Sequence, residues 1–384
     1  MEPDVQNGGS SMGKAILWLV VLVLIVGGFI LYGSRGGSAT KEPIKIGFTG
    51  PLTGDLANIG QNAKAAVEIA VEEVNAAGGI KGRPLEVIYE DDKCAGPEGV
   101  SAATKLINVD KVPVILGSVC SPAMLAFAPI AETAKVPVLG YCATAPKISQ
   151  AGDYIFRDVP SDLFQAKFAA QYIYTTLGKK TASVLYINND WGVGLHQAFG
   201  EAFAALGGKI VSDEAYDPTS KDLRTQLSKV KAAKADVLYF AGFTDSTVVG
   251  LKQAKEAKLT QTIFGADAWD DNKIWEGLGA AGDGAIFTVV GTNSSDAFKA
   301  KMKEKVGNDS IVYCSNYAYD GIKILSQVLS DVGTDGTAVK DALYKSSYTG
   351  GVSSPKIEFD QNGDPKESSY VIKVVKDGKA DVMK

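Results

Sequence analysis

The chain has 384 residues, which at roughly 150 residues per domain predicts two globular units and excludes a single small domain. Hydrophobic residues make up 46% and charged residues 22%, so neither wholesale disorder nor a multi-span membrane protein is indicated. The net charge of -5 argues against a nucleic-acid partner, because phosphate binding needs a basic excess. His196 is the single histidine, so we expect no metal site and no cofactor.

An uncharged apolar run lies near the N-terminus, from Ala15 to Tyr32. At about 1.5 Å per residue it approaches the ~30 Å bilayer core, so it predicts a transmembrane helix. A short tail would precede this helix, and Ser34–Thr40 would follow as a flexible linker, with the body outside the cytoplasm. A cleaved signal peptide is the alternative, although its apolar region usually spans only ~7–15 residues.

The next part of the chain alternates short β-branched runs with longer amphipathic ones, which is typical of βαβ units. In the first predicted helix the apolar residues recur at three- and four-residue steps, and Gly78-Gly79 would end it. The predicted strands and helices, in chain order, are Ile44–Phe48, Asn62–Ala77, Leu85–Glu90, Pro97–Asn108, Val114–Leu116, Ala123–Ala134 and Val138–Leu139.

A second succession of the same kind follows Val159-Pro160, so the predicted fold is α/β, with two doubly wound parallel sheets. Its elements are Asp162–Leu177, Ala182–Ile187, Val193–Leu206, Lys209–Ala215, Leu223–Ala232, Val237–Ala241, Ser246–Ala257 and Thr262–Phe264. The remaining pieces are too few for a third domain and must complete the first two: Ala285–Val290, Asp296–Val306, Asn316–Leu329, Ile357–Phe359 and Tyr370–Val375.

Open parallel sheets bind ligands beyond the carboxyl ends of their strands, so two facing sheets would form a cleft. Ser121 follows a predicted strand and precedes a proline, which is typical of a helix N-cap and is also compatible with binding a carboxylate at the helix N-terminus. Thr144 is either a turn residue or a second hydroxyl at the same anion. Asp267 ends a strand; it is either a turn former or a partner for an ammonium group.

Trp191 and Phe243 follow strands at similar places and would belong either to the core or to an apolar ligand wall. The sequence has no Walker A or HExxH motif, and its partial glycine pattern near Gly192 is a weak nucleotide signal. Four cysteines without CxxC spacing favour disulfides over zinc, but counting does not settle which of them pair.

Four stretches together carry a resemblance: IGFTGPLTGDLANIGQNAKAAVEIAVEEVNAAGGIKGRPLEVIYEDDKC, VPVILGSVCSPA, LGYCATAPKIS and SVLYINNDWGVGLHQAF. The body from about Ile44 to Val375 resembles the type I periplasmic binding proteins of the leucine/isoleucine/valine-binding family. These are the solute receptors of branched-chain amino acid ABC importers. The resemblance implies two lobes joined by a three-strand hinge, with crossings near Arg157–Asp162, Val289–Thr292 and Pro365–Ser369. Lobe I would comprise residues 43–160 and 291–366, and lobe II residues 161–290 and 367–384.

The resemblance also implies a ligand site. Ser121 and Thr144 would hold the ligand carboxylate and ammonium, together with the Cys142 carbonyl, and Asp267 would replace the glutamate that is usual at the ammonium. The other site residues would be Trp191 and Phe243, where tyrosines are frequent, and the pocket residues Ile59 and Val119. Cys94 and Cys120 match the family disulfide, which leaves Cys142 and Cys314 unexplained.

The expected function is that of a membrane-tethered, non-catalytic receptor, which captures an amino acid by hinge closure and presents it to an ABC permease. The amino acid would be aliphatic or branched-chain; amides, urea or aromatic acids are alternative ligands. A sensory receptor of the same fold is the first rival and an enzyme the second. The enzyme is disfavoured by the single histidine.

Overall fold

The computed structural model describes residues 1, 3, 42–307 and 311–383. Residues 43–384 form one compact unit. The predicted transmembrane helix at 15–32 and the linker after it lie outside the described residues. Within the described ranges, no helix combines the length and the apolar composition that a membrane span requires.

The first sheet has five strands in the order β2-β1-β3-β4-β5, and all its neighbouring strands are parallel. The register pairs Ile44 with Leu85 and Gly47 with Ile115. The strands are β1 (Ile44–Gly50), β2 (Leu85–Asp91), β3 (Ile115–Leu116), β4 (Val138–Gly140) and β5 (Ile155–Arg157).

The second sheet has seven strands in the order β14-β13-β10-β9-β8-β6-β7. Its strands from β6 to β10 are parallel, but β13 runs antiparallel to both β10 and β14. The predicted parallel sheets are therefore confirmed except at this edge, where an antiparallel hairpin completes the second sheet. The strands are β6 (Thr181–Ile187), β7 (Lys209–Tyr216), β8 (Val237–Ala241), β9 (Thr262–Gly265), β10 (Ile286–Val290), β13 (Tyr370–Lys376) and β14 (Lys379–Val382).

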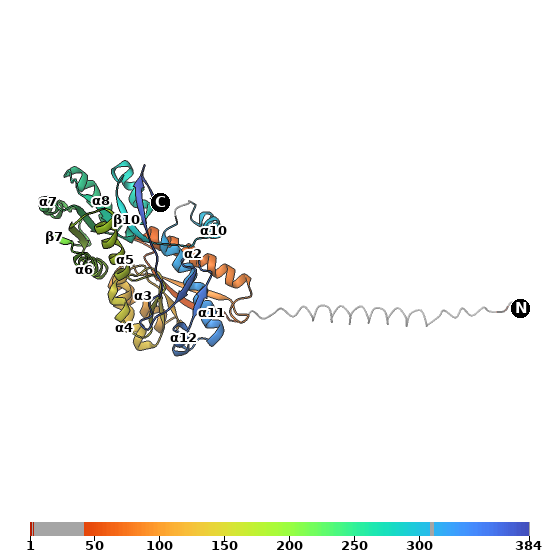
Figure 1. Ribbon diagram of the computed structural model, residues 1–384. Helices are drawn as coiled ribbons and strands as arrows, with labels where there is room; N and C mark the ends of the chain where they lie inside the picture. The colour runs from red at the N-terminus through yellow and green to blue at the C-terminus, as the bar shows by residue number, and fades with distance from the viewer. Residues whose placement is uncertain (2, 4–41, 308–310, 384) are drawn as a thin grey trace. The chain divides into compact units, whose positions relative to one another are not determined.

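Helices pack against both sheets (Figure 1). Each sheet with its helices forms one half of the body, and we call these the five-stranded half and the seven-stranded half. The five-stranded half has α2 (Ala57–Ala76), α3 (Gly96–Asn108), α4 (Ser121–Ala134), α10 (Asp296–Val306), α11 (Tyr313–Val332) and α12 (Gly336–Leu343), with the hairpin β11 (Ser347–Thr349) and β12 (Lys356–Glu358). The seven-stranded half has α5 (Asp162–Gln171), α6 (Asp190–Ala205), α7 (Arg224–Ala233), α8 (Thr244–Glu256) and α9 (Asn272–Leu278).

The short helices are η1 (Pro146–Gln150), η2 (Tyr172–Thr176), η3 (Asp267–Trp269) and η4 (Gly279–Ala281). The π-helical turn η2 continues α5, and η1 and η3 follow strands at the ends nearest the predicted site.

Helix α2 shows how the apolar pattern sets an element. Its small and branched residues lie buried, including Ala63, Ala66 and Val67. The helix begins five residues before the predicted start, because Leu56 and Ile59 are also buried and extend the stripe towards the N-terminus. It ends at the predicted glycines: Gly79 has φ +69°, and a Cβ there would lie 2.1 Å from the Arg83 carbonyl oxygen.

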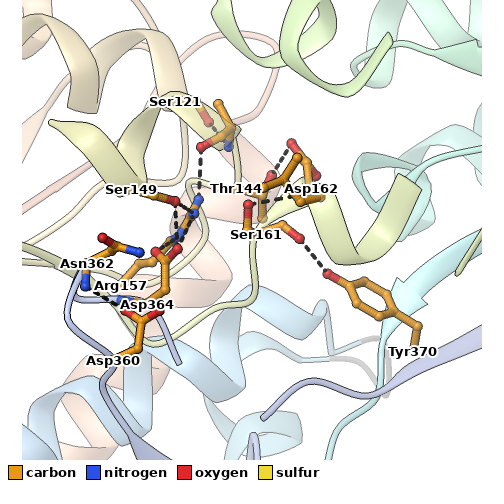
Figure 2. Close-up of polar contacts among 12 residues, drawn as sticks. Ser121, Thr144, Ser149, Arg157, Ser161, Asp162, Asp360, Asn362, Asp364 and Tyr370 are labelled. Atoms are coloured by element: carbon orange, nitrogen blue, oxygen red, sulfur yellow. Dashed lines mark hydrogen bonds and ion pairs between the residues drawn. The ribbon is translucent and has the colours of Figure 1, made fainter. Parts of the chain in front are cut away.

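The chain passes between the two sheets at three places, through residues 158–161, 291–295 and 366–369. Tyr370 lies beside the first and third passages, where its hydroxyl donates to the Ser161 carbonyl at 3.3 Å (Figure 2). Two halves joined by three adjacent segments have the connectivity of a hinged body.

Two disulfides join elements of the five-stranded half. Cys94 and Cys120, whose Cα atoms are 5.1 Å apart, link the segments that precede α3 and α4, so the pair implied by the resemblance is confirmed. Cys142 and Cys314 form a second disulfide, with Cα atoms 5.3 Å apart, between the loop after β4 and the first turn of α11.

Candidate functional site

The loop after β4 is held in place by Arg157, whose side chain is fully buried. The guanidinium donates to the Ala145 carbonyl at 2.9 Å and to the Ser149 hydroxyl at 2.7 Å. It also pairs with both carboxylate oxygens of Asp364, at 2.6 and 3.1 Å (Figure 2). A bidentate pair of this kind fixes geometry as well as charge, so the loop is ordered by the protein's own contacts.

Ser121 is the first residue of α4 rather than its N-cap, so the predicted capping role is wrong. Cys120 occupies the cap position, and no side chain caps this helix in the described structure. The buried Ser121 hydroxyl accepts the N–H of Ala145 at 3.0 Å, which joins the start of α4 to the loop after β4. The first turn of α4 carries no acidic residue, so its N–H groups face no competing carboxylate of their own helix.

Thr144 and Asp267, predicted from separate loops, belong to one hydrogen-bonded network. The Thr144 hydroxyl donates to Asp162 Oδ2 at 3.0 Å (Figure 2). Gln165, one turn further along α5, donates to Asp162 Oδ1 at 2.9 Å, and its own Oε1 accepts the N–H of Asp267 at 2.9 Å. The network therefore connects the loop after β4 in the five-stranded half with the segment after β9 in the other half.

Asp267 opens η3 and its side chain is buried, with 2% of the residue exposed. Its Oδ2 accepts the Tyr313 hydroxyl at 2.6 Å, and its Oδ1 accepts the N–H of Ala268 at 3.0 Å. Tyr313 is the first residue of α11, so this bond also crosses between the two halves. The predicted acid is thus placed at the junction that the cleft hypothesis requires.

Burial raises the pKa of both acids in this network. The pKa of Asp162 lies well above its ordinary value, first because of desolvation and second because of the negative charge of Asp267. The pKa of Asp267 is also raised by burial, against the lowering effect of the Tyr313 and Gln165 hydrogen bonds. Two buried carboxyl groups that repel each other form an environment in which a cation is strongly favoured.

Trp191 and Phe243 form a stacked aromatic pair, with ring centroids 4.9 Å apart and planes inclined by 19°. Trp191 lies in the first turn of α6 and is buried, whereas Phe243, just before α8, is partly buried. Both belong to the seven-stranded half. The two rings form an apolar contact within this half, and α6, which carries Trp191, packs against η1.

The three other predicted residues are buried in the five-stranded half. Cys142 lies two residues before Thr144, and its disulfide partner Cys314 is next to Tyr313 in α11. Ile59 is in the first turns of α2 and Val119 precedes α4. Their burial is compatible both with the core and with a ligand pocket.

Asp162, Gln165 and Tyr313 are site residues that the sequence reasoning missed. The sequence predicts Asp162 at the start of a helix and at the end of a crossing between the lobes, where an acidic residue usually stabilises the helix N-terminus. The signal available was its spacing from Gln165, because residues three apart lie on one face of a helix. Tyr313 lies outside the predicted helix, which begins three residues early in the structure, and no local pattern links it to Asp267.

In the described part of the chain, no group of three or more histidine, cysteine, aspartate or glutamate side chains is arranged to hold a metal ion. The polar groups of the network are carboxyls, hydroxyls, amides and backbone groups. Such groups suit a small polar organic ligand with a cationic end.

The fold and this junction define the class of protein. Residues 43–379 match the model of the periplasmic binding protein family, and the chain belongs to that family. It is a family of type I α/β binding proteins rather than of enzymes.

Particular relatives are similar over most of their length. The chain is 28% identical to the leucine-, isoleucine-, valine-, threonine- and alanine-binding protein of Pseudomonas aeruginosa, over 91% of this chain and 93% of that protein. The crystal structure of the leucine-binding protein LivK from Thermotoga maritima has a TM-score of 0.83 at 28% identity, covering 89% of this chain and 98% of that one. The branched-chain amino acid binding protein LivJ from Streptococcus pneumoniae, solved with isoleucine, has a TM-score of 0.81 at 26% identity, covering 89% and 99%.

Proposed function

We propose that this protein is the extracytoplasmic solute receptor of an ABC importer and that it binds an aliphatic amino acid between its two halves. The observation that carries the proposal is the buried pair of acids, Asp162 and Asp267, at the junction of the halves. An α-ammonium group beside them would supply the positive charge that this environment favours. The relative from Pseudomonas aeruginosa, named as a leucine-, isoleucine-, valine-, threonine- and alanine-binding protein, and LivJ, solved with isoleucine, support the same ligand class.

The ligand carboxylate would lie at the start of α4, where Ser121 contributes its hydroxyl and the helix its N-terminal N–H groups. Thr144 and the Cys142 carbonyl would contact the ammonium from the same side. The aliphatic side chain would lie towards Trp191, Phe243, Ile59 and Val119. In this arrangement the ligand ammonium would be paired with the two acids, and the ligand carboxylate would face the positive end of the α4 dipole.

Binding would depend on closure of two hinged lobes. We assign residues 43–160 and 291–366 to lobe I and residues 161–290 and 367–384 to lobe II, with the three passages between the sheets as the hinge. Closure would exclude water from the ligand charges and strengthen their interactions with the acids. The closed receptor would then present its ligand to the permease.

An aromatic acid is a less suitable ligand for this site, although the Trp191–Phe243 wall would accept a flat ring. A carboxylate without an ammonium group would bring a negative charge towards the two buried acids, Asp162 and Asp267, with no cation to offset it. A sensory receptor would use the same binding site, and its distinction from a transport receptor rests on the partner in the membrane.

Tethering to the membrane is a further part of the proposal and rests on sequence alone. The uncharged run from Ala15 to Tyr32 is long enough for a signal anchor, and cleavage as a signal peptide would instead release the body. Membrane fractionation followed by mass determination of the mature N-terminus would distinguish the two. An intact N-terminus in the membrane fraction supports the anchor.

The function is tested by identifying what the full chain binds. Small molecules released from the purified protein would be identified by mass spectrometry, and the proteinogenic amino acids would then be titrated by calorimetry. We expect an aliphatic amino acid to bind with one molecule per protein chain. Binding of aromatic carboxylates alone would contradict the proposed ligand class. Chemical turnover of the bound amino acid would contradict a purely binding function.

A further inference from the structure

The segment of the seven-stranded half from Asp267 to Asp271 is contacted twice by side chains of the five-stranded half. At one end the Tyr313 hydroxyl donates to Asp267 at 2.6 Å. At the other end Asn58 Nδ2 donates to Asp271 Oδ1 at 2.7 Å, between residues 213 positions apart in the chain. The first contact belongs to the proposed ligand site, whereas the second lies four residues beyond it.

Asn58 uses its side-chain nitrogen for contacts with the other half. It is the second residue of α2, and its Nδ2 also donates to Asn272 Oδ1 at 3.0 Å. An amide nitrogen carries two hydrogens, so these two bonds use both of them. The nitrogen of Asn58 therefore has no donor left for a ligand, and its role is between the halves.

Asp271 is a buried acceptor that depends on these donors. Its residue is fully buried, and it is the N-cap of α9, where it accepts the N–H of Lys273 at 3.0 Å. Its other oxygen accepts the Thr244 hydroxyl at 2.6 Å. Thr244 and Lys273 lie in the same half as Asp271, so a separation of the halves would leave these bonds intact but would break the bond from Asn58.

We propose that Asn58 is a latch residue: by donating to buried Asp271 across the junction, it stabilises the closed form and slows ligand release without contacting the ligand. The inference rests on the proposed function, because it needs a body that opens and closes. A charge-assisted hydrogen bond in a buried setting is among the stronger polar contacts, so its loss has a measurable effect on closure.

The chain offers a matched control at another contact between the halves. Lys147 of η1 and Asp190 of α6 form an ion pair at 3.1 Å, with side chains that are 64% and 42% exposed. An exposed pair of this kind contributes little, because water and salt screen it. Lys147→Ala therefore removes a contact between the halves without removing a buried one.

The latch is tested by stopped-flow measurement of amino-acid release from the full chain. For Asn58→Ala we expect release to be about 10- to 100-fold faster, with little change in the association rate. The release rate should increase by the same factor for every amino acid that binds, because Asn58 does not contact the ligand. Lys147→Ala should change release by less than about twofold. Equal release from wild type and Asn58→Ala, or a factor that differs between ligands, would overturn the latch.

A swap of donor and acceptor separates the latch from a merely structural role. Asn58→Asp alone places two carboxylates face to face and should release ligand faster than Asn58→Ala. Adding Asp271→Asn restores a pair of one amide and one carboxylate, with the donor now at position 271 and the acceptor at position 58. We expect this double variant to release ligand more slowly than Asn58→Asp alone or Asp271→Asn alone. Failure of the swap to slow release, when the melting temperatures of all variants match wild type, contradicts the latch.

A readout without added ligand keeps this test separate from the proposed function. Spin labels at Ser101 in α3 and Glu201 in α6, both exposed, report the distance between the halves in the protein as purified. Asn58→Ala should increase the share of long distances relative to wild type, and an unchanged distribution overturns the latch. Absence of heat with every amino acid would instead contradict the proposed ligand class.

Discussion

Asp162 and Asp267 receive their hydrogen bonds from neutral groups: a hydroxyl and an amide at the first, a phenol and a backbone N–H at the second. Arg157 lowers the pKa of Asp162 only as a smaller effect, and its guanidinium is paired with Asp364. The pair is therefore suited to binding a cation from outside the protein. It is also costly to the ligand-free protein, because each acid is buried.

Replacing Asp267 by asparagine should separate binding from stability. Asp267→Asn keeps the shape of the side chain but removes its charge, so we expect amino-acid affinity to fall by about 2–5 kcal/mol, or ~30- to 5000-fold in Kd. The ligand-free variant should melt no lower than wild type, since a buried repulsive charge has been removed. Calorimetry and thermal unfolding measure the two effects.

Asp213→Asn is the control for this experiment, because Asp213 is an exposed acid whose side chain contacts His196 rather than a residue of the proposed site. It should leave Kd unchanged. An unchanged Kd for Asp267→Asn as well would remove that residue from the ammonium site.

Ligand binding should release protons. The raised pKa values of Asp162 and Asp267 mean that the ligand-free protein holds protons above pH 3.8, the ordinary value, and an ammonium group would lower both pKa values again. Affinity should therefore rise with pH from 3.8 upwards until both acids are ionised in the free protein. Calorimetry in buffers of different ionisation enthalpy measures the released protons, and a heat independent of buffer throughout this range would be inconsistent with the ammonium site.

The stability of the ligand-free protein should change with pH in the opposite direction to the affinity. These acids bind protons more tightly when folded than when unfolded, so their contribution is fully favourable below pH 3.8 and is lost as pH rises through their raised pKa values. A bound amino acid should reduce that loss.

Single positions differ in how far the sequence could predict them. Ser121, Thr144 and Asp267 were selected because polar residues after parallel strands face a common edge, and the structure joins all three to one set of neighbouring contacts. Their roles towards a ligand stay predictions. Asp162 and Tyr313 could not be selected in this way, because their importance arises from partners in distant segments.

Among the elements, the two disulfides have different expected effects. The Cys142–Cys314 bridge spans 172 residues and Cys94–Cys120 spans 26, so chain entropy alone gives upper values of about 5 and 3.5 kcal/mol. Replacing Cys142 and Cys314 by alanine should lower the free energy of unfolding by roughly 2–5 kcal/mol, and more than replacing the other pair.

Urea unfolding of the two double variants provides this comparison. Ligand affinity should also fall in the Cys142/Cys314 variant, because the bridge joins the loop before Thr144 to the turn that carries Tyr313. A smaller stability loss than for the Cys94/Cys120 variant would show that the long bridge does not constrain the unfolded chain.

The predicted elements agree with the structure where an apolar period is long, as in α2 and the central strands. The missed strands and helices are short, with three residues in β5 and β11, four in β14, seven in α9 and eight in α12, which are too few to display a period. The antiparallel direction of β13 was also missed, because direction depends on how the chain returns from the other half rather than on the composition of the strand.

For the molecule as a whole, the two successions of βαβ units were enough to predict two sheets. They did not predict the contacts between the two halves. Asn58 and Asp271 are 213 positions apart, and each resembles an ordinary polar residue near a helix start. Their pairing is determined by how two completed halves meet. The second disulfide, between residues 172 positions apart, is a similar case.

The most direct test of an ammonium site between two hinged lobes changes the ligand and leaves the protein intact. Calorimetry of the full chain would compare leucine, isoleucine and valine with their α-keto analogues, which keep the side chain and the carboxylate but lack the ammonium group. We expect the amino acids to bind at least about 30-fold more tightly, since the keto acids leave Asp162 and Asp267 without a cation. Equal or tighter binding of the keto acids would contradict the site.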